Sequence, residues 1–281
     1  MSSAAILGLG AIAGFTIFLG LPLGRVRNAS IALRACLNGL AAGVLVFLLW
    51  EVLSHSAEPV EESLLAATDG TGSWSHFLGQ AVVFTTGLGV GLLALVYYDQ
   101  WIGRVVGKKH GPGAMSVAER PARGLIVLAD PARRLAVLIA VGIGLHNLAE
   151  GLAIGQSAAA GDLHLALLLV IGFGLHNATE GFGIVAPLAG AEKRPSWALL
   201  ALLGLIGGGP TFVGTVIGQS FVNETVSLAF LALAAGSILY VVAQLLKVGF
   251  KLDRPRALYW GLFGGLLLGL ATDFFLAAAG G

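Results

Sequence analysis

The sequence predicts an all-α integral membrane protein with eight transmembrane helices, and three observations lead to this fold class. Of the 281 residues, 57% are hydrophobic and only 11% are charged, which lies outside the range of an ordinary soluble domain. Apolar runs long enough to cross about 30 Å of hydrocarbon recur along the chain. The basic residues occur only between particular runs, as they do when they mark one side of a membrane.

The apolar runs define the expected helices in order. The first, residues 4–24, lacks a basic segment before it and is longer than the core of a signal peptide, so we interpret it as a retained span. A basic stretch containing GKKHGPGAMS, residues 102–134, predicts a flexible cytoplasmic loop after the third span. The remaining spans are expected at 31–54, 77–101, 135–158, 163–188, 197–218, 225–247 and 257–277, within a single membrane domain over 1–281.

The orientation follows from the charges. All 16 Lys and Arg residues lie on odd-numbered connections, whereas the even-numbered connections carry acidic residues and no Lys or Arg. Because basic residues stay on the cytoplasmic side, both termini are expected outside the cytoplasm of a cell membrane. The lipid bilayer is therefore a partner. Nucleic acid is not expected as one, since the net charge is only +1 and no aromatic residues alternate with the basic ones.

Two polar motifs interrupt consecutive apolar runs. GLHNLAEGLAIG at 144–155 is nearly repeated by GLHNATEGFGIV at 174–185. Consecutive spans cross the bilayer in opposite directions, so these motifs form an inverted pair. A second inverted pair, AAGVLVFLLWEVL at 41–53 and AAGSILYVVAQLL at 234–246, extends the pattern to a 3+2+3 inverted-repeat arrangement. The candidate site residues are His146, Asn147, Glu150, His176, Asn177 and Glu180.

These six side chains predict a cation site. A carboxylate at mid-bilayer costs several kcal/mol unless it is protonated, paired or bound to metal, and neither span contains Lys or Arg. Imidazole, carboxylate and amide oxygen suit Zn²⁺, Fe²⁺ or Mn²⁺. With the two histidines level, Glu150 should lie about 6 Å outward and Glu180 about 6 Å inward, as a track. The alternative is a helix-packing device in which protonated glutamates bond to histidines.

The two motifs resemble those of the ZIP, or Zrt/Irt-like, metal transporters. Their fourth span typically carries HN-x-x-[DE]-G, matched by HNLAEG at 146–151, and their fifth a related motif, matched more loosely by HNATEG at 176–181. The resemblance implies that all six candidate residues bind metal. The chain departs from the family pattern in lacking acidic residues at 197–218 and in carrying Gln244 where glutamate is common. A single metal ion, or one that moves between positions, is therefore expected rather than a fixed pair.

The resemblance implies a transporter, not an enzyme, that moves Zn²⁺, or Fe²⁺ or Mn²⁺, into the cytoplasm by alternating access. The metal is then cargo, and no cofactor is expected. Spans one, four, five and six would move against spans two, three, seven and eight, and the resemblance leaves a homodimer through the latter group open. Two other functions stay open: a membrane-embedded zinc enzyme that activates water, and a proton-coupled transporter of an organic solute that uses Glu150 and Glu180.

Other polar residues near span ends have two interpretations. A set of five could recruit cations at an entrance, although solvation explains them equally well: Glu51, His55, Glu58, Asp162 and His164. Asp99 and Asp273 are interpreted as hydrated at the interface. The GGGP sequence at 207–210 predicts either a hinge or close packing against the two central spans.

Overall fold

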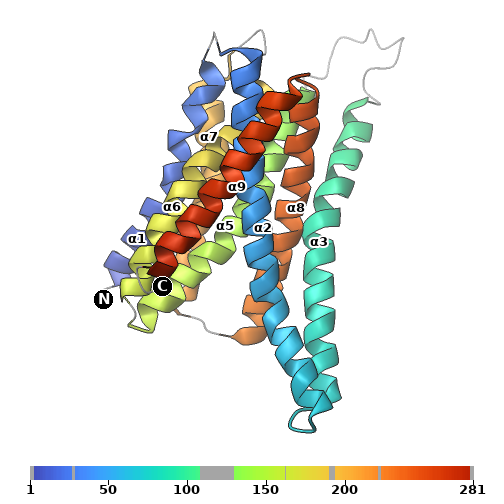
Figure 1. Cartoon of the computed structure of the whole chain (residues 1–281), viewed down its shortest axis with the longest axis vertical. Helices are drawn as coiled ribbons and strands as arrows, with labels where there is room; N and C mark the ends of the chain where they lie inside the picture. The colour runs from blue at the N-terminus through green and yellow to red at the C-terminus, as the bar shows by residue number, and fades with distance from the viewer. Residues whose placement is uncertain are drawn as a thin grey trace, which may run out of the picture.

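The computed structural model describes residues 3–26, 29–107, 130–161, 163–189, 194–220 and 223–278. Within these ranges the chain forms helices and connecting turns without a β-strand. Eight of the helical segments are long and apolar enough to cross a membrane. The predicted all-α fold with eight helices of membrane-spanning length is therefore confirmed over the described residues (Figure 1), whereas the 3+2+3 inverted-repeat arrangement stays a prediction.

The helices follow one another with short connections, apart from the segment after the third span. The first span consists of α1 (Ser3–Phe15) continued by the 3₁₀ turns η1 (Thr16–Leu19) and η2 (Leu21–Arg25). The next two are α2 (Ile31–Thr68) and α3 (Trp74–Gly107). The remaining spans are α5 (Pro131–Ala159), α6 (Leu163–Val185) extended by η4 (Ala186–Leu188), α7 (Trp197–Gly218), α8 (Glu224–Phe250) and α9 (Pro255–Ala278).

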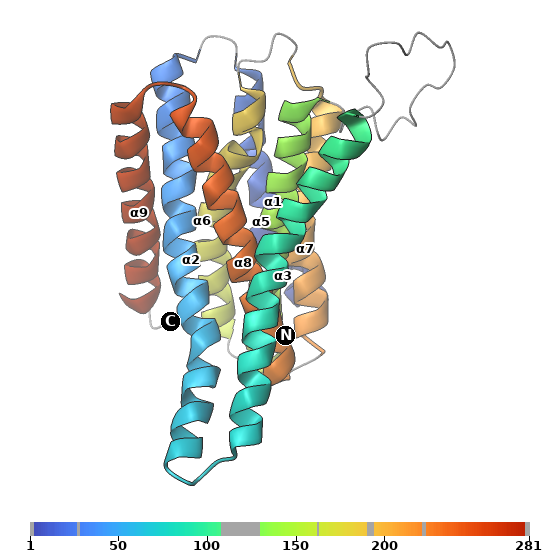
Figure 2. The same ribbon diagram turned by 90° about the vertical axis from the view of Figure 1, so that its right-hand side faces the viewer.

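Three helix ends differ from the predicted spans. Helix α2 does not stop at residue 54 but continues to Thr68, so that α2 and α3 form a hairpin that projects beyond the other helices (Figures 1 and 2). Its 38 residues rise about 57 Å, which is more than a bilayer needs. The polar segment after residue 54 therefore continues as a helix beyond the hydrocarbon region of the membrane. Helices α3 and α5 also enter the expected loop at 102–134, whose residues 108–129 lie outside the described part.

The helices pack as two groups. In the first group, α5 packs against α7 and α6, and α1 packs against α6 and α7. In the second group, α2 packs against α9 and α8, and α3 packs against α8. The two groups meet mainly where α5 contacts α8 and α2 contacts α6. Figure 1 shows α1, α6 and α7 on one side and α2, α8 and α3 on the other, with α5 between them.

Glycines allow the closest helix crossings. At the crossing of α1 and α7, a Cβ added to Gly14 would lie 2.3 Å from the Gly208 carbonyl oxygen, and one added to Gly208 would lie 2.1 Å from that of Gly14. Helix α7 passes through Pro210 without interruption. The close packing expected between the GGGP segment and a central span is found at α5, where a Cβ added to Gly144 would lie 3.1 Å from Pro210 Cγ.

Both termini lie at the same end of the bundle (Figure 2). The start of α2 and the connection from α8 to α9 lie at the opposite end (Figure 2), and Arg34 belongs to the first turn of α2. This agrees with the even number of spans. Which end faces the cytoplasm stays a prediction from the distribution of charge.

Candidate metal centre

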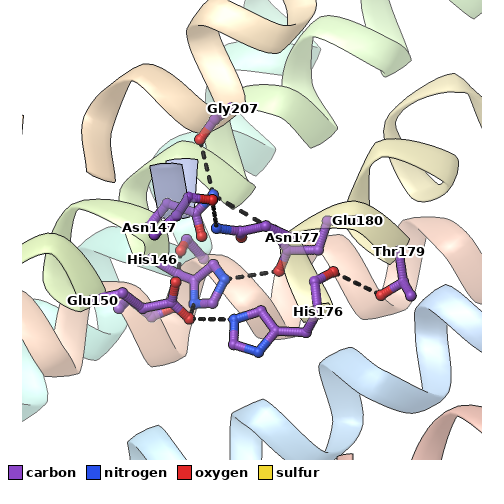
Figure 3. Close-up of polar contacts among 11 residues, drawn as sticks. His146, Asn147, Glu150, His176, Asn177, Thr179, Glu180 and Gly207 are labelled. Carbon is purple, nitrogen blue, oxygen red and sulfur yellow. Dashed lines mark hydrogen bonds and ion pairs between the residues drawn. The ribbon is translucent and has the colours of Figure 1, made fainter. Parts of the chain in front are cut away.

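The six candidate residues come together midway along α5 and α6. His146, Asn147, Asn177 and Glu180 are fully buried, and Glu150 and His176 are only 6% and 7% exposed. The two helices contact each other directly, so side chains from both share one interior space. The polar residues of the two sequence motifs therefore form one cluster (Figure 3).

The histidines and glutamates form two reciprocal pairs between the helices. His146 Nε2 lies 2.8 Å from Glu180 Oε1, and His176 Nε2 lies 2.6 Å from Glu150 Oε1 (Figure 3). Glu180 and Glu150 lie beside different ring nitrogens of His146, so the expected order from Glu150 through the histidine to Glu180 agrees with these contacts, although one imidazole reaches both carboxylates. A helical side chain points toward the N-terminus of its helix, so Glu150 on α5 and Glu180 on α6 both reach back toward the level of the histidines.

Three of the six residues form a compact set. His146, Glu150 and His176 each offer one possible metal-binding atom, and these atoms lie within 4.8 Å of one another. His146 Nδ1 is 3.7 Å from Glu150 Oε1. When His146 Nε2 carries its hydrogen and donates it to Glu180, the Nδ1 lone pair is free for a metal. Glu180 then orients the imidazole in the way that carboxylates commonly orient metal-bound histidines.

The two asparagines anchor the site helices to their neighbours. Asn147 Nδ2 donates to the Gly207 carbonyl of α7 at 2.9 Å, and Asn177 Nδ2 donates to the Ala13 carbonyl of α1 at 3.1 Å. A longer contact of 3.5 Å joins Asn147 Nδ2 to Glu180 Oε2. The sequence indicated only metal binding for these side chains. Their anchoring role depends on helices distant in the sequence and has no local signal.

Several buried polar atoms of the site have no hydrogen-bond partner among the described residues. They are His146 Nδ1, Asn147 Oδ1, Glu150 Oε2 and Asn177 Oδ1. An unpaired buried polar atom costs about 1–3 kcal/mol, so native proteins rarely keep several together without a function. A helix-packing device explains the two His–Glu contacts but not these four atoms. All four are atoms that a bound cation could contact.

A cavity of about 230 Å³ extends from the cluster toward the connection between α5 and α6, as its lining by Ala149 and Ala153 of α5 and Leu169 of α6 indicates. His146 and Glu150 lie on its wall, and Glu51 and His55 of α2 line it as well. This agrees with an entrance role for those two residues. Glu58 is exposed farther along α2, Asp162 lies outside the described residues, and nothing is described of the His164 side chain.

Two further residues beside the site were not assigned to it from the sequence. The Phe173 ring lies one helical turn before His176, with its centroid 5.5 Å from that of the imidazole, and it lines the same cavity. Asp273 of α9 lines a second, smaller cavity together with Glu51 and His176. The spacing of three residues could have identified Phe173 as a neighbour of His176. The position of Asp273 depends on packing between the two helix groups.

The comparisons with known proteins agree with this geometry. The sequence profile of one family, described as ZIP zinc transporter, matches residues 109–251, which is just over half of the chain. The match includes both histidine motifs and extends from before α5 to the end of α8. A search among curated proteins found no significant match.

Proposed function

The chain belongs to the ZIP zinc transporter family, and on this basis we propose that it carries Zn²⁺, in preference to Fe²⁺ or Mn²⁺, into the cytoplasm. The observation that supports this most strongly is the compact, buried set of His146, Glu150 and His176, of which His146 and Glu150 line the 230 Å³ cavity. Two imidazoles and a carboxylate make a mixed nitrogen and oxygen ligand set, which suits Zn²⁺.

Charge balance explains why the cargo is a divalent cation. Glu150 and Glu180 together bring two negative charges into a site whose helices carry no Lys or Arg nearby. One divalent ion neutralises both carboxylates. In the metal-free site, protons shared with His146 and His176 fulfil this role, and they must leave as the metal binds.

We assign the six residues distinct roles in holding the ion. His146 Nδ1, Glu150 and His176 Nε2 bind it from the cavity side, where their atoms already lie close together. Glu180 orients His146 and provides the carboxylate on the far side of the cluster. The unpaired Oδ1 atoms of Asn147 and Asn177 are additional oxygen ligands, held in place through their amide nitrogens.

The packing on either side of the cluster supports alternating access. The cavity opens toward the predicted outside, whereas apolar side chains close the opposite side where the helix groups meet: Ala41, Leu45, Ile184, Val241 and Leu245, each at most 1% exposed. An ion can therefore approach from one side only. Its release requires the group α1, α5, α6 and α7 to move against α2, α3, α8 and α9.

Matching contacts in the two halves support the inverted repeat. Asn147 donates a hydrogen bond to the Gly207 carbonyl of α7, and Asn177 correspondingly donates one to the Ala13 carbonyl of α1. The next residues, Gly208 and Gly14, pack against each other's carbonyl oxygens. The two AAG segments also correspond, because the glycine of each packs against the backbone of a neighbouring helix. Gly43 of α2 packs against α9, and Gly236 of α8 packs against α3. A two-fold axis that relates the two halves of the chain would produce these matching pairs of contacts.

The test is metal uptake into proteoliposomes that contain the purified, folded protein. We expect flux of radioactive Zn²⁺, smaller flux of Fe²⁺ and Mn²⁺, and none of Mg²⁺, which prefers an all-oxygen shell. Protein-free liposomes are the control. A folded protein that moves none of these transition-metal ions would refute the proposal, and flux of an organic solute driven by a pH gradient would favour the proton-coupled alternative.

A further inference from the structure

Two arginines that follow each other in the first turn of α5 make different ion pairs. Arg134 Nε lies 2.9 Å from Asp99 Oδ1 of α3, whereas Arg133 Nε lies 3.3 Å from Oδ2 of Asp130, the N-cap residue of the same helix α5. Helices α5 and α3 belong to different helix groups. The Arg134 pair therefore joins the two groups, and the Arg133 pair does not. The sequence had suggested that Asp99 is simply hydrated, which the structure corrects.

A second contact between the groups lies toward the same end of the bundle. The guanidinium of Arg34 on α2 donates a hydrogen bond to the carbonyl oxygen of Ala189, directly after η4. By contrast, Arg25 remains within its own group, because it donates to the Pro195 carbonyl and stacks on Trp197 at 4.6 Å. Both of these contacts between the groups lie at the end opposite the 230 Å³ cavity, whereas a longer contact of 3.4 Å, from Gln156 Nε2 to Ser227 Oγ, joins α5 to α8 at the cavity end.

We propose that the Asp99–Arg134 ion pair is a latch that holds the cytoplasmic ends of the two helix groups together while the metal site is open to the outside. This inference rests on the proposed transport function, since it assumes that the groups separate at this end to release the ion. Closure of the 230 Å³ cavity and separation of Asp99 from Arg134 would then be parts of one conformational change.

The position of the pair suits a contact that must open and re-form in each cycle. The side chains of Arg134 and Asp99 are 20% and 36% exposed, so water can replace each partner when they separate. A fully buried pair would leave uncompensated charges on opening. The latch therefore biases the two conformations toward the outward-open one without locking it.

The test measures thiol accessibility from each side of the membrane in proteoliposomes, in a Cys36→Ala background. Ala153→Cys reports on the outer cavity. Val248→Cys reports on a cavity of about 70 Å³ between the groups at the opposite end. With Asp99→Asn or Arg134→Gln, we expect the ratio of inner to outer labelling to rise roughly two- to five-fold, as the loss of a partly exposed ion pair implies.

Arg133→Gln is the matched control, because it removes the same charge one residue away without affecting a contact between groups. It should leave both labelling rates unchanged, and the exchange Asp99→Arg with Arg134→Asp should restore the wild-type ratio. A ratio in Asp99→Asn equal to that in Arg133→Gln would overturn the latch. Zn²⁺ uptake by the parent protein in the same vesicles tests transport separately: uptake with an unchanged ratio refutes the latch alone, whereas no uptake refutes the function.

Discussion

At the scale of single residues, the site is defined by a reciprocal exchange of partners between two helices. Each histidine makes its shortest contact with the glutamate of the opposite helix, and His146 also lies near Glu150 of its own motif. The two motifs consequently act as one unit, and a change in either should affect the whole site.

Removal of a histidine or glutamate from this unit should nearly abolish transport. His146→Ala deletes the imidazole that contacts both Glu150 and Glu180, and Glu180→Ala deletes its orienting partner. We expect metal binding at least about a hundredfold weaker in each variant, since losing a buried interaction of a charged group costs about 3 kcal/mol. Isothermal titration and vesicle uptake measure this effect.

Glu61→Gln is the control for these variants, because Glu61 is an exposed carboxylate on the projecting part of α2. It should transport and bind metal as the parent does. Wild-type uptake by both His146→Ala and Glu180→Ala would show that the ion passes elsewhere.

Acidification should weaken metal binding at the same site. Histidine and carboxylate ligands bind metal only when deprotonated, so protons compete with the ion. Each proton that the ligands carry must leave before the ion binds, so Zn²⁺ affinity should fall as the pH is lowered from about 7.5 to about 5.5. Equilibrium titrations at these two values measure it, and equal affinities would argue against imidazole ligation.

At the scale of elements, the position of the site depends on glycines that bring helices into backbone contact. Helices α1 and α7 cross at Gly14 and Gly208, next to the carbonyls of Ala13 and Gly207 that anchor the site asparagines. Any increase in the separation of these helices would therefore also displace Asn147 and Asn177.

Gly208→Ala should accordingly destabilise the protein, because the added Cβ would lie 2.1 Å from a backbone oxygen. Overpacking of this kind typically costs about 1–3 kcal/mol. Gly209→Ala is a close control, since a Cβ at that position meets nothing within 4 Å. Thermal unfolding in detergent should show a lower midpoint for Gly208→Ala only. Equal midpoints for the two variants would mean that the crossing is not tightly packed in the native protein.

At the scale of the whole molecule, two helix groups with a cavity beside the site on one side and buried apolar packing on the other imply exchange between two conformations. Zn²⁺ should shift this exchange, because it binds and neutralises the site that lies between them. We expect saturating Zn²⁺ to change the labelling of Ala153→Cys and Val248→Cys in opposite directions, relative to metal-free vesicles. Mg²⁺ at the same concentration provides the control for ionic strength.

Labelling of both positions at once, with no response to Zn²⁺, would instead indicate a continuous pore. That outcome would replace alternating access with a channel mechanism while leaving the metal site itself intact.

The sequence by itself determined the class of the protein and the chemistry of its site. Apolar runs of span length and the asymmetry of basic residues depend only on local composition, so the eight helices could be predicted without any contact information. The repeated HN-x-x-E-G motif was likewise visible along the chain, and its spacing placed histidine, asparagine and glutamate on one helical face.

Only the tertiary structure decided how these parts meet. The pairing of His146 with Glu180, the anchoring of Asn147 and Asn177 to α7 and α1, and the ion pair between Asp99 and Arg134 all join residues on different helices. The extension of α2 to Thr68 was also missed, because the polar segment after residue 54 carries no signal that ends a helix at the membrane surface. Local periodicity specifies a helix and its faces, but crossing points and side-chain partners are set by close packing between distant segments.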